Sequence, residues 1–315
     1  MGMKKESFPA FFLDSVGQPL RQSVSLCDYS RFRIGGEADF FFEASTSAEL
    51  AASVRSAREF KLSHYVIGEG CNLLFDDQGF RGLIIRNRTR GLGLDREKGE
   101  VEAWSGTPLE DVIQLCLEEG LSGLEALAGI PGTIGGAVFS NAGAFGRCIG
   151  DCLKEALLLD EKGRKIKVRK EYFAFDYRYS SLRTQHRLVL KTVFALKSGD
   201  KKEIKGKIAE ILEKRNKRHP PGKTAYAGSY FKNPVLPDGE KVVAAVLLDK
   251  VGAKEIKVGG AAVYQGHANF ILNKGGATAE DVLSLAQELK RRVREKHNIE
   301  LEEEVIFLPA EFSMP

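Results

Sequence analysis

The stretch GIPGTIGGAVFSNAGAFG, residues 129–146, decides the fold of this chain. Six glycines fall within it, with Pro131 among them. Because neither a regular helix nor a strand tolerates that density of glycine, we expect irregular backbone here. A glycine-rich corner that lets two segments pack closely is one interpretation. Small residues along the whole stretch favour another, in which a large flat ligand lies against bare main chain.

A second glycine loop, GEGCN at residues 68–72, directly follows a short strand that we expect at 64–67. Its glycines allow a tight turn whose N–H groups could bind a pyrophosphate without a basic side chain, although a plain turn after a strand would look the same. No third glycine opens a helix, and the apolar residues 73–75 follow. The loop therefore lacks the Rossmann fingerprint, so a dinucleotide bound here would imply another fold.

Strands and helices alternate around these loops. The expected strands are 40–43, 64–67, 82–86, 100–104, 153–159, 165–168, 188–196, 269–273 and 305–308. The expected helices are 47–61, 107–120, 200–217, 241–248 and an amphipathic one that begins at Thr278. Two helices open on predicted capping boxes, Thr46 with Glu49 and Thr107 with Glu110. The pattern indicates an α+β protein of at least two domains, with a junction at the charged helix 200–217.

Composition and charge exclude several function classes. With 315 residues and a net charge of +4, the chain is large enough for a sizeable core but not basic enough to indicate nucleic acid. The basic run at 214–218 could bind phosphate, or it could be the solvated end of a helix. The longest apolar run, 242–248, is too short to span a bilayer, and the N-terminal residues resemble no signal peptide. Five cysteines without metal-ligand spacing favour free thiols, no metal and a cytoplasmic location.

Seven motifs occur in the order of one known family. They are RIGG (33–36), GEGCNLLF (68–75), the 129–146 stretch, FDYRYS (175–180), GSYFKNP (228–234), HANFI (267–271) and LEEEV (301–305). Together they resemble the UDP-N-acetylenolpyruvoylglucosamine reductases, also called UDP-N-acetylmuramate dehydrogenases. The short segment between Arg178 and Ser229 is similar to the second, shorter type of that family. Many of that type carry an arginine at the position of Ile306.

The resemblance implies a two-lobed FAD-binding domain of the vanillyl-alcohol-oxidase (PCMH) type and a C-terminal α+β substrate domain. The implied bounds are 1–92 and 93–199 for the two lobes, with the PCMH-type region at about 34–199, and 200–315 for the substrate domain. FAD would bind non-covalently, with Cys71 a small replacement for the usual serine rather than a flavin thioether. The implied FAD-binding residues are Gly68, Glu69, Gly70, Cys71, Asn72, Leu73, Gly129, Ile130, Pro131, Gly132, Thr133, Gly135, Gly136, Ala137, Asn141, Ala142 and Gly143.

The family's reaction reduces UDP-N-acetylglucosamine enolpyruvate with hydride from NADPH, passed through flavin N5. By resemblance, Arg178 stabilises the negative charge that develops on the substrate carboxylate, Ser229 donates the proton, and Glu304 orients or polarises that carboxylate. Without the motifs these residues would be a surface ion-pair partner, a turn residue and part of a solvated charge run. The pattern alone does not choose between Glu302 and Glu304.

Six further residues are candidates for contacts with the UDP-sugar, namely Tyr177, Arg215, Arg218, Lys232, Asn233 and Gln265. Lys232 could also activate Ser229, and His267 could be structural. We expect small-molecule partners, with no nucleic acid, membrane or obligatory oligomer. The alternative function is a flavin oxidase of the same fold acting on an alcohol or sugar acid. A non-catalytic sensor would lack the three catalytic residues, which are present.

Overall fold

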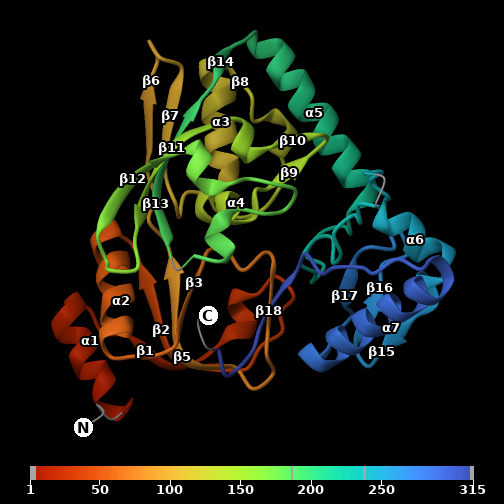
Figure 1. Ribbon diagram of the computed structural model, residues 1–315, viewed down its shortest axis with the longest axis horizontal. Coiled ribbons are helices and arrows are strands. Elements are labelled where there is room, and N and C mark those ends of the chain that lie inside the picture. The colour runs from red at the N-terminus through yellow and green to blue at the C-terminus, as the bar shows by residue number, and fades with distance from the viewer. Residues whose placement is uncertain (1–4, 186, 237–238, 313–315) are drawn as a thin grey trace.

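A four-stranded sheet with strand order β1-β2-β5-β3 forms the first lobe of the computed structural model, which describes residues 5–185, 187–236 and 239–312. β5 runs parallel to both β2 and β3, whereas β1 is antiparallel to β2. The helices α1 and α2 cover one face, and α2 begins at the predicted capping box, where Glu49 N donates to Thr46 Oγ1 at 3.1 Å (Figure 1). The elements are η1 (Lys5–Ser7), α1 (Phe8–Val16), β1 (Arg21–Ser25), η2 (Leu26–Tyr29), β2 (Glu37–Ala44), α2 (Ser47–Glu59), β3 (His64–Ile67), β4 (Leu73–Phe75) and β5 (Phe80–Asn87).

An antiparallel sheet with strand order β12-β11-β13-β7-β6 forms the second lobe. The predicted hairpin between β11 and β12 is confirmed, and α3 and α4 pack against the apolar residues of β7, β11 and β13. The elements are β6 (Leu92–Asp95), β7 (Glu100–Trp104), α3 (Leu109–Glu119), β8 (Leu121–Ser122), η3 (Glu125–Leu127), α4 (Ile134–Ser140), β9 (Gly143–Ala144), β10 (Arg147–Cys148), η4 (Ile149–Asp151), β11 (Leu153–Leu159), β12 (Lys165–Arg169), η5 (Lys170–Phe173), η6 (Ser181–Arg183), β13 (Leu188–Ala195) and β14 (Lys197–Ser198).

A third lobe follows the long helix α5, which runs diagonally from the second lobe toward it (Figure 1). Here α6 and α7 pack on the small sheet β15-β16-β17. The expected amphipathic helix is confirmed as α7, whose apolar stripe is buried and whose N-cap is Thr278. The elements are α5 (Lys201–Arg218), α6 (Ala244–Lys250), η7 (Ala253–Glu255), β15 (Lys257–Val258), β16 (Ala261–Val263), β17 (Ile271–Asn273), α7 (Ala279–His297) and β18 (Ile306–Leu308).

The end of the chain returns to the first lobe. β18 pairs in parallel with β4, and Ile306 lies opposite Leu73, the residue that follows the first glycine loop. Phe32 and Leu74 from the N-terminal part contribute to the core of the third lobe. The predicted boundary at 92–93 falls in β6 and the one at 199–200 falls just before α5. The division into domains at these residues stays a prediction.

Two local predictions are wrong. The capping box at Thr107 is absent, because α3 has Pro108 as its N-cap and Thr107 Oγ1 instead bonds the backbone of Gly91 at 3.1 Å. The middle of the 129–146 stretch is also not irregular, since it forms the short helix α4. Thr133 caps that helix, and Gly135 brings it so close to Ser105 that a Cβ would lie 3.1 Å from the Ser105 carbonyl oxygen.

The other expected elements differ only in their ends, whereas α1, β1, β6 and β16 are among the elements that the sequence did not predict. The helix expected from 241 begins at Ala244, and the strand expected from 269 begins at Ile271. All five cysteines are free thiols. Among the residues described, no helix combines the length and the hydrophobicity needed to cross a lipid bilayer.

Candidate active site

One large cavity of about 1080 Å³ is lined by residues from all three lobes. Its wall includes both glycine loops, the turn that carries Arg178, the end of α5 and the segments around Ser229 and Glu304. This volume lies at the upper end of the range of about 300–1,000 Å³ that ligand pockets occupy. The cavity is therefore large enough for a cofactor and a second molecule beside it.

The two glycine loops meet at the cavity. A Cβ on Gly68 would lie 2.6 Å from Thr133 Oγ1, so the loops are in direct contact. Gly70 has φ +61°, and a Cβ there would collide with the carbonyl oxygen of Tyr29. Only glycine fits these two positions. At Gly68 a side chain would collide with Thr133, and at Gly70 it would collide with Tyr29 and the backbone is also left-handed.

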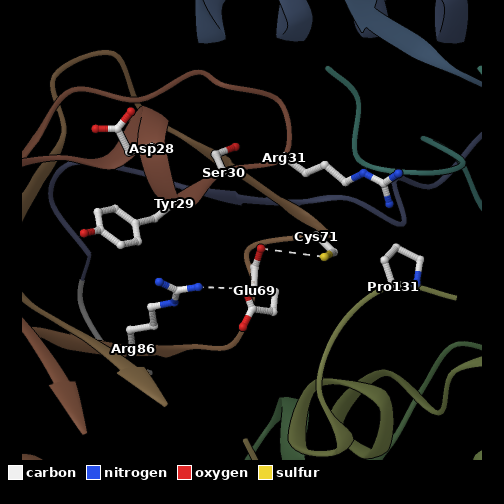
Figure 2. A pocket seen from close by; sticks show the side chains of 8 residues that line it. All are labelled: Asp28, Tyr29, Ser30, Arg31, Glu69, Cys71, Arg86 and Pro131. Atoms are coloured by element: carbon white, nitrogen blue, oxygen red, sulfur yellow. Dashed lines mark hydrogen bonds and ion pairs between the residues drawn. The ribbon is translucent and has the colours of Figure 1, made fainter. Parts of the chain in front are cut away.

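Figure 2 shows a smaller pocket, about 330 Å³, beside the first loop. Glu69 points toward Arg86, which it contacts at 2.7 Å, while Arg31 and Pro131 lie near Cys71 at the other end. The side chain of Glu69 is thus held in an ion pair. Any contact of Glu69 with a cofactor would come from its backbone.

The Cys71 thiol is neutral at physiological pH. Burial raises its pKa to about 11, with a smaller opposing effect of Arg31, and its Sγ donates to Glu69 O at 3.6 Å. A neutral thiol is a weak nucleophile, because the thiolate is the reactive form. This favours the small-residue role of Cys71 over a covalent thioether.

Two glycines of the second loop border open space rather than protein. A Cβ at Gly132 would meet no atom within 4 Å, and one at Gly136 would meet only Thr133 Oγ1, at 3.7 Å. Both residues line the cavity, and packing within the protein does not account for the missing side chains. At Gly132 the backbone φ of +127° itself favours glycine, so Gly136 is the position that neither packing nor backbone conformation explains. Bare main chain along a cavity of this size fits a flat ring system such as the isoalloxazine of FAD.

A two-residue turn places Arg178 in the cavity. Its neighbours Asp176 and Tyr179 exchange backbone hydrogen bonds at 3.2 and 3.1 Å, and Arg178 has φ +54°. The guanidinium Nη1 donates to Gly143 O at 2.8 Å, and Nε lies 2.9 Å from Glu304 Oε1. That second contact is an ion pair without hydrogen-bond geometry. Left-handed backbone at a non-glycine residue is costly and is typical of functional sites.

Paired backbone segments carry Ser229 and Glu304. Tyr230 N donates to Asn269 O at 2.8 Å, and Glu304 N donates to Tyr230 O at 2.7 Å. Ser229 directly precedes Tyr230 and lines the cavity, as Glu304 does. The three predicted catalytic residues therefore border one cavity, and two of them are fixed to each other through main-chain bonds.

The structure distinguishes Glu304 from its neighbours. The Glu302 side chain is 71% exposed and pairs with Lys232, whereas the Glu304 side chain is 16% exposed. Glu303 pairs with Lys290 at 2.9 Å. The pattern alone did not choose between Glu302 and Glu304, because in a regular strand both would lie on the same side. The segment before β18 is irregular, so the two side chains differ in exposure.

The carboxyl group of Glu304 holds its proton more strongly than usual. Burial raises its pKa, and the charges of Arg178, Arg183 and Lys232 oppose that rise without cancelling it. In its protonated form a carboxyl group can donate a hydrogen bond as well as accept one, and the raised pKa favours that form.

The end of the cavity near α5 is basic. Burial lowers the pKa of Arg215, and the charges of Arg178 and Arg31 lower it further. Arg31 also lies over the Tyr226 ring, with Cζ 4.8 Å from the centroid. Burial lowers the pKa of His219 to about 4, and Arg215 contributes to that shift. Converging cations of this kind suit an anionic ligand such as a diphosphate.

The side chains of the basic run at 214–218, which lies in α5, point in different directions. Lys214 and Lys217 form exposed pairs with Glu210 and Glu213, at 2.5 and 2.6 Å, while Arg215 lines the cavity. Lys214 and Lys217 therefore fit the interpretation as a solvated helix end, whereas phosphate binding by Arg215 stays a prediction.

The predicted cofactor-binding residues all line the cavity except Asn141. Asn141 caps α4 in left-handed backbone, and its Nδ2 donates to Asp176 O at 2.8 Å. It thereby holds the turn that carries Arg178. Its contact with FAD stays a prediction.

Most of the predicted UDP-sugar contacts lie outside the cavity wall. Arg215 is in the wall, whereas the other five candidates are not among the described residues that form it. Tyr177 accepts from Asn233 N at 3.2 Å, and Gln265 donates to Lys254 O at 2.7 Å. The candidates outside the wall are Tyr177, Arg218, Lys232, Asn233 and Gln265. His267 bonds Asn269 N through Nδ1 and stacks on Phe270, as a structural residue would.

Sequence reasoning missed several wall residues, among them Arg31, Phe139, Arg183 and His219. Arg31 and Arg183 flank recognised motifs, at 33–36 and 175–180, and His219 precedes Pro220 at the end of α5. Their closeness to the motifs was the available signal, but nothing local shows which way such side chains point.

Comparisons with known proteins agree along nearly the whole chain. Residues 38–169 match the model of an FAD binding domain, and residues 220–308 match that of the C-terminal domain of UDP-N-acetylenolpyruvoylglucosamine reductase. The reductase of Carboxydothermus hydrogenoformans is 39% identical over 290 residues, 91% of this chain and 93% of that protein. The reductase of Acaryochloris marina is 38% identical over 305 residues, 96% of this chain and 97% of that protein.

A solved structure gives the same result. The crystal structure of UDP-N-acetylenolpyruvylglucosamine reductase from Thermus caldophilus has a TM-score of 0.75 at 35% sequence identity, covering 92% of this chain and 100% of that one. The predicted fold class, an α+β protein with a two-lobed FAD-binding domain and a C-terminal α+β domain, is confirmed.

Proposed function

Since this chain belongs to the UDP-N-acetylenolpyruvoylglucosamine reductase family, we propose that Arg178, Ser229 and Glu304 form its catalytic centre. The protein is an FAD-dependent oxidoreductase that uses NADPH to reduce UDP-N-acetylglucosamine enolpyruvate to UDP-N-acetylmuramate, a step of peptidoglycan precursor synthesis. The flavin-oxidase alternative is the weaker interpretation. One observation supports the proposed centre above all: the Arg178–Glu304 ion pair and Ser229 border the cavity that both glycine loops line.

FAD, when bound, supplies the hydride chemistry that no side chain provides. We propose that the first loop holds its pyrophosphate through backbone N–H groups. The second loop and α4 would lie along the ring system. The contact between Gly68 and Thr133, and the open space at Gly132 and Gly136, support this arrangement.

Arg178 would bind the carboxylate of the substrate. Its Nε already lies 2.9 Å from Glu304 Oε1 in an ion pair, so an incoming carboxylate would share Arg178 with Glu304 or displace it. Because negative charge grows on that carboxylate during reduction, a fixed cation there lowers the barrier. Glu304, with its raised pKa, could donate a hydrogen bond to the same group.

Ser229 would deliver the proton to the α-carbon of the substrate. It follows Gly228, which has φ +81°, and is fixed by the bond from Tyr230 N to Asn269 O. A hydroxyl is a weak acid, so cations near it are needed to favour proton release. Lys232, whose charge reaches Glu304, is the helper that we propose.

The test uses Ser229→Ala and follows each half of the reaction separately. NADPH should bleach the flavin absorbance of this variant as it does in the parent, since the first half needs no proton donor to carbon. Recovery of the absorbance on adding UDP-N-acetylglucosamine enolpyruvate should slow by about 100- to 10,000-fold, the usual contribution of a general acid.

The matched control is Ser284→Ala, because Ser284 is a half-buried residue of α7 that is not among the described residues lining the cavity. Both half-reactions of that variant should match the parent. Equal recovery rates in Ser229→Ala and the parent would contradict the proton-donor role. Failure of the parent to recover at all would refute the reductase function itself.

We also propose a cytoplasmic location and a monomer that is sufficient for catalysis. The five free thiols suit a reducing compartment, and the proposed catalytic residues come from a single chain. The end of the cavity with the cations Arg31 and Arg215, beside the neutral His219, is where we propose that the diphosphate of the substrate binds.

A further inference from the structure

Arg183 is a half-buried arginine with two guanidinium nitrogens that lack a hydrogen-bond partner among the described residues. It lies at the end of η6, five residues after Arg178, and lines the large cavity. Two of its guanidinium nitrogens, Nε and Nη2, are shielded from solvent, and neither has an acceptor among the described residues. Leaving buried charged donors unpaired is costly, so native proteins do so rarely and for a reason.

Among the described residues, Arg183 forms no ion pair within 4.0 Å, and Glu304, the carboxylate that its charge influences, is paired with Arg178. The Cζ of Arg183 lies 5.4 Å from the centroid of the Phe139 ring, a contact that attracts a cation but accepts no hydrogen bond. The charge of Arg183 opposes the rise that burial causes in the pKa of the half-buried Tyr65, and it has the same effect on Glu304, which lies in the ion pair with Arg178.

Arg183 lines the cavity together with the two glycine-rich segments that we assign to FAD. Tyr65 belongs to β3, which leads into the first glycine loop, and Phe139 belongs to α4, which forms the middle of the second glycine-rich stretch. Glu304 stands beside the first loop, since Asn72 Nδ2 donates to its carbonyl oxygen at 2.9 Å. A ligand that contacts both loops must therefore pass close to this guanidinium.

We propose that Arg183 is a cofactor-binding residue whose free N–H groups donate to an acceptor oxygen of bound FAD. Two parts of FAD offer such an acceptor, the pyrophosphate and the carbonyl edge of the isoalloxazine. This inference deepens the proposed function, because it names a contact of the same cavity. It does not depend on the roles of Ser229 or Glu304.

The first test is the affinity of the deflavinated full-length protein for FAD, measured by quenching of flavin fluorescence. Arg183→Gln should raise the dissociation constant about tenfold to a hundredfold, as expected for loss of a charge-assisted hydrogen bond. Arg183→Lys, which keeps the charge but not the fork, should lie between this variant and the parent. The control Arg96→Gln removes an exposed arginine of the second lobe and should leave the affinity unchanged.

The second test separates binding from a purely structural role by the thermal stability of the FAD-free proteins. If the unpaired donors of Arg183 bind the cofactor, they have no partner in the FAD-free protein. FAD-free Arg183→Gln should then melt at the same temperature as the FAD-free parent or higher, because an uncompensated charge has been removed. If Arg183 only supports the fold through Phe139, the same variant should melt lower and bind FAD normally once folded. That result would overturn the proposal.

Two further measurements identify the acceptor. ADP contains the pyrophosphate without the isoalloxazine, so weaker binding of ADP by Arg183→Gln with an unchanged flavin midpoint potential would place the contact on the pyrophosphate. A cation beside the isoalloxazine favours its reduced, more negative form, so a lower midpoint potential with unchanged ADP binding would place it on the ring. FAD affinity within twofold of the parent, with an unchanged potential, would refute the assignment whatever the outcome of the Ser229→Ala experiment.

Discussion

Arg178 and Arg183 lie five residues apart and show two ways in which one motif places cations. Arg178 reaches the cavity because left-handed backbone turns it inward, and Gly143 O and Glu304 hold its guanidinium. Arg183 reaches it from a 3-10 turn and finds no acceptor. The resemblance left Ile306 where an arginine is common, and Ile306 lines the same cavity as Arg183. Binding of FAD by Arg183 would therefore supply a cation that Ile306 does not.

His219 makes stability depend on pH. Burial lowers its pKa to about 4, with further lowering by Arg215, His267 and Arg31, against about 6.5 in an unfolded chain. Between these two values only the unfolded state binds the proton, so the free energy of unfolding should fall as the pH drops from about 6.5 to about 4. Because His219 is only partly buried, we expect a loss of about 1–2 kcal/mol.

Urea unfolding at pH 7.5 and pH 5 checks this expectation. In His219→Gln the free energy of unfolding should differ less between pH 7.5 and pH 5 than it does in the parent, because glutamine does not titrate in this range. An equal difference in the variant and the parent would mean that other groups cause the acid sensitivity.

Helix α4 shows why sequence patterns failed at the element scale. The glycine density of residues 129–146 excludes a helix on propensity alone, since each glycine costs about 1 kcal/mol relative to alanine. The helix nevertheless forms because Thr133 caps it and Gly135 packs closely against Ser105, a contact between distant segments. The failed capping box at Thr107 has a similar cause, as the hydroxyl bonds Gly91 instead. Elements with a local signal, such as α2 with its Thr46 cap, were predicted correctly.

Gly136→Ala tests whether α4 lies against the cofactor. A Cβ there would make only an ordinary contact, 3.7 Å from Thr133 Oγ1, so the FAD-free protein should be as stable as the parent or gain up to about 1 kcal/mol. If the ring system of FAD rests on this main chain, the added methyl group should weaken FAD binding at least about tenfold. Fluorescence titration and thermal melting measure the two effects.

Gly135→Ala is the matched control in the same helix. Its Cβ would press on Ser105 at 3.1 Å, so this variant should lose stability even without FAD. Unchanged FAD affinity in Gly136→Ala would show that the cofactor lies elsewhere in the cavity.

At the scale of the whole molecule, the sequence motifs predicted which residues meet but not how the lobes do so. Both glycine loops, Arg178, Ser229 and Glu304 border one cavity, as the order of motifs implied. The contacts that build it join distant segments, such as β18 with β4 and Asn273 Nδ2 with Phe32 O at 3.0 Å. No local pattern encodes these pairings, which also explains why most predicted UDP-sugar contacts fall outside the wall.

Asp77 offers a test of how strongly the lobes depend on each other. It lies between β4 and β5 of the first lobe, yet its carboxylate caps α7 of the third by accepting from Ala279 N at 2.8 Å and Glu280 N at 3.2 Å. Asp77→Ala should lower the free energy of unfolding by about 1–2 kcal/mol, the range for loss of an N-terminal cap. Because β18 and Phe32 also join the lobes, the loss should appear as a shift of one cooperative urea transition.

Thr278→Ala is the control for Asp77→Ala, because it removes a cap of the same helix that comes from the third lobe itself. Both variants should destabilise α7 to a similar extent. Only Asp77→Ala should also weaken FAD binding. Asp77 closely follows β4, the strand that leads away from the first glycine loop, and β4 pairs with β18, the strand that comes after Glu304. The parent protein could instead unfold in two separate urea transitions, with Asp77→Ala affecting only one of them. That result would show that the third lobe folds independently. The cavity would then be assembled by docking of the lobes rather than by a shared core.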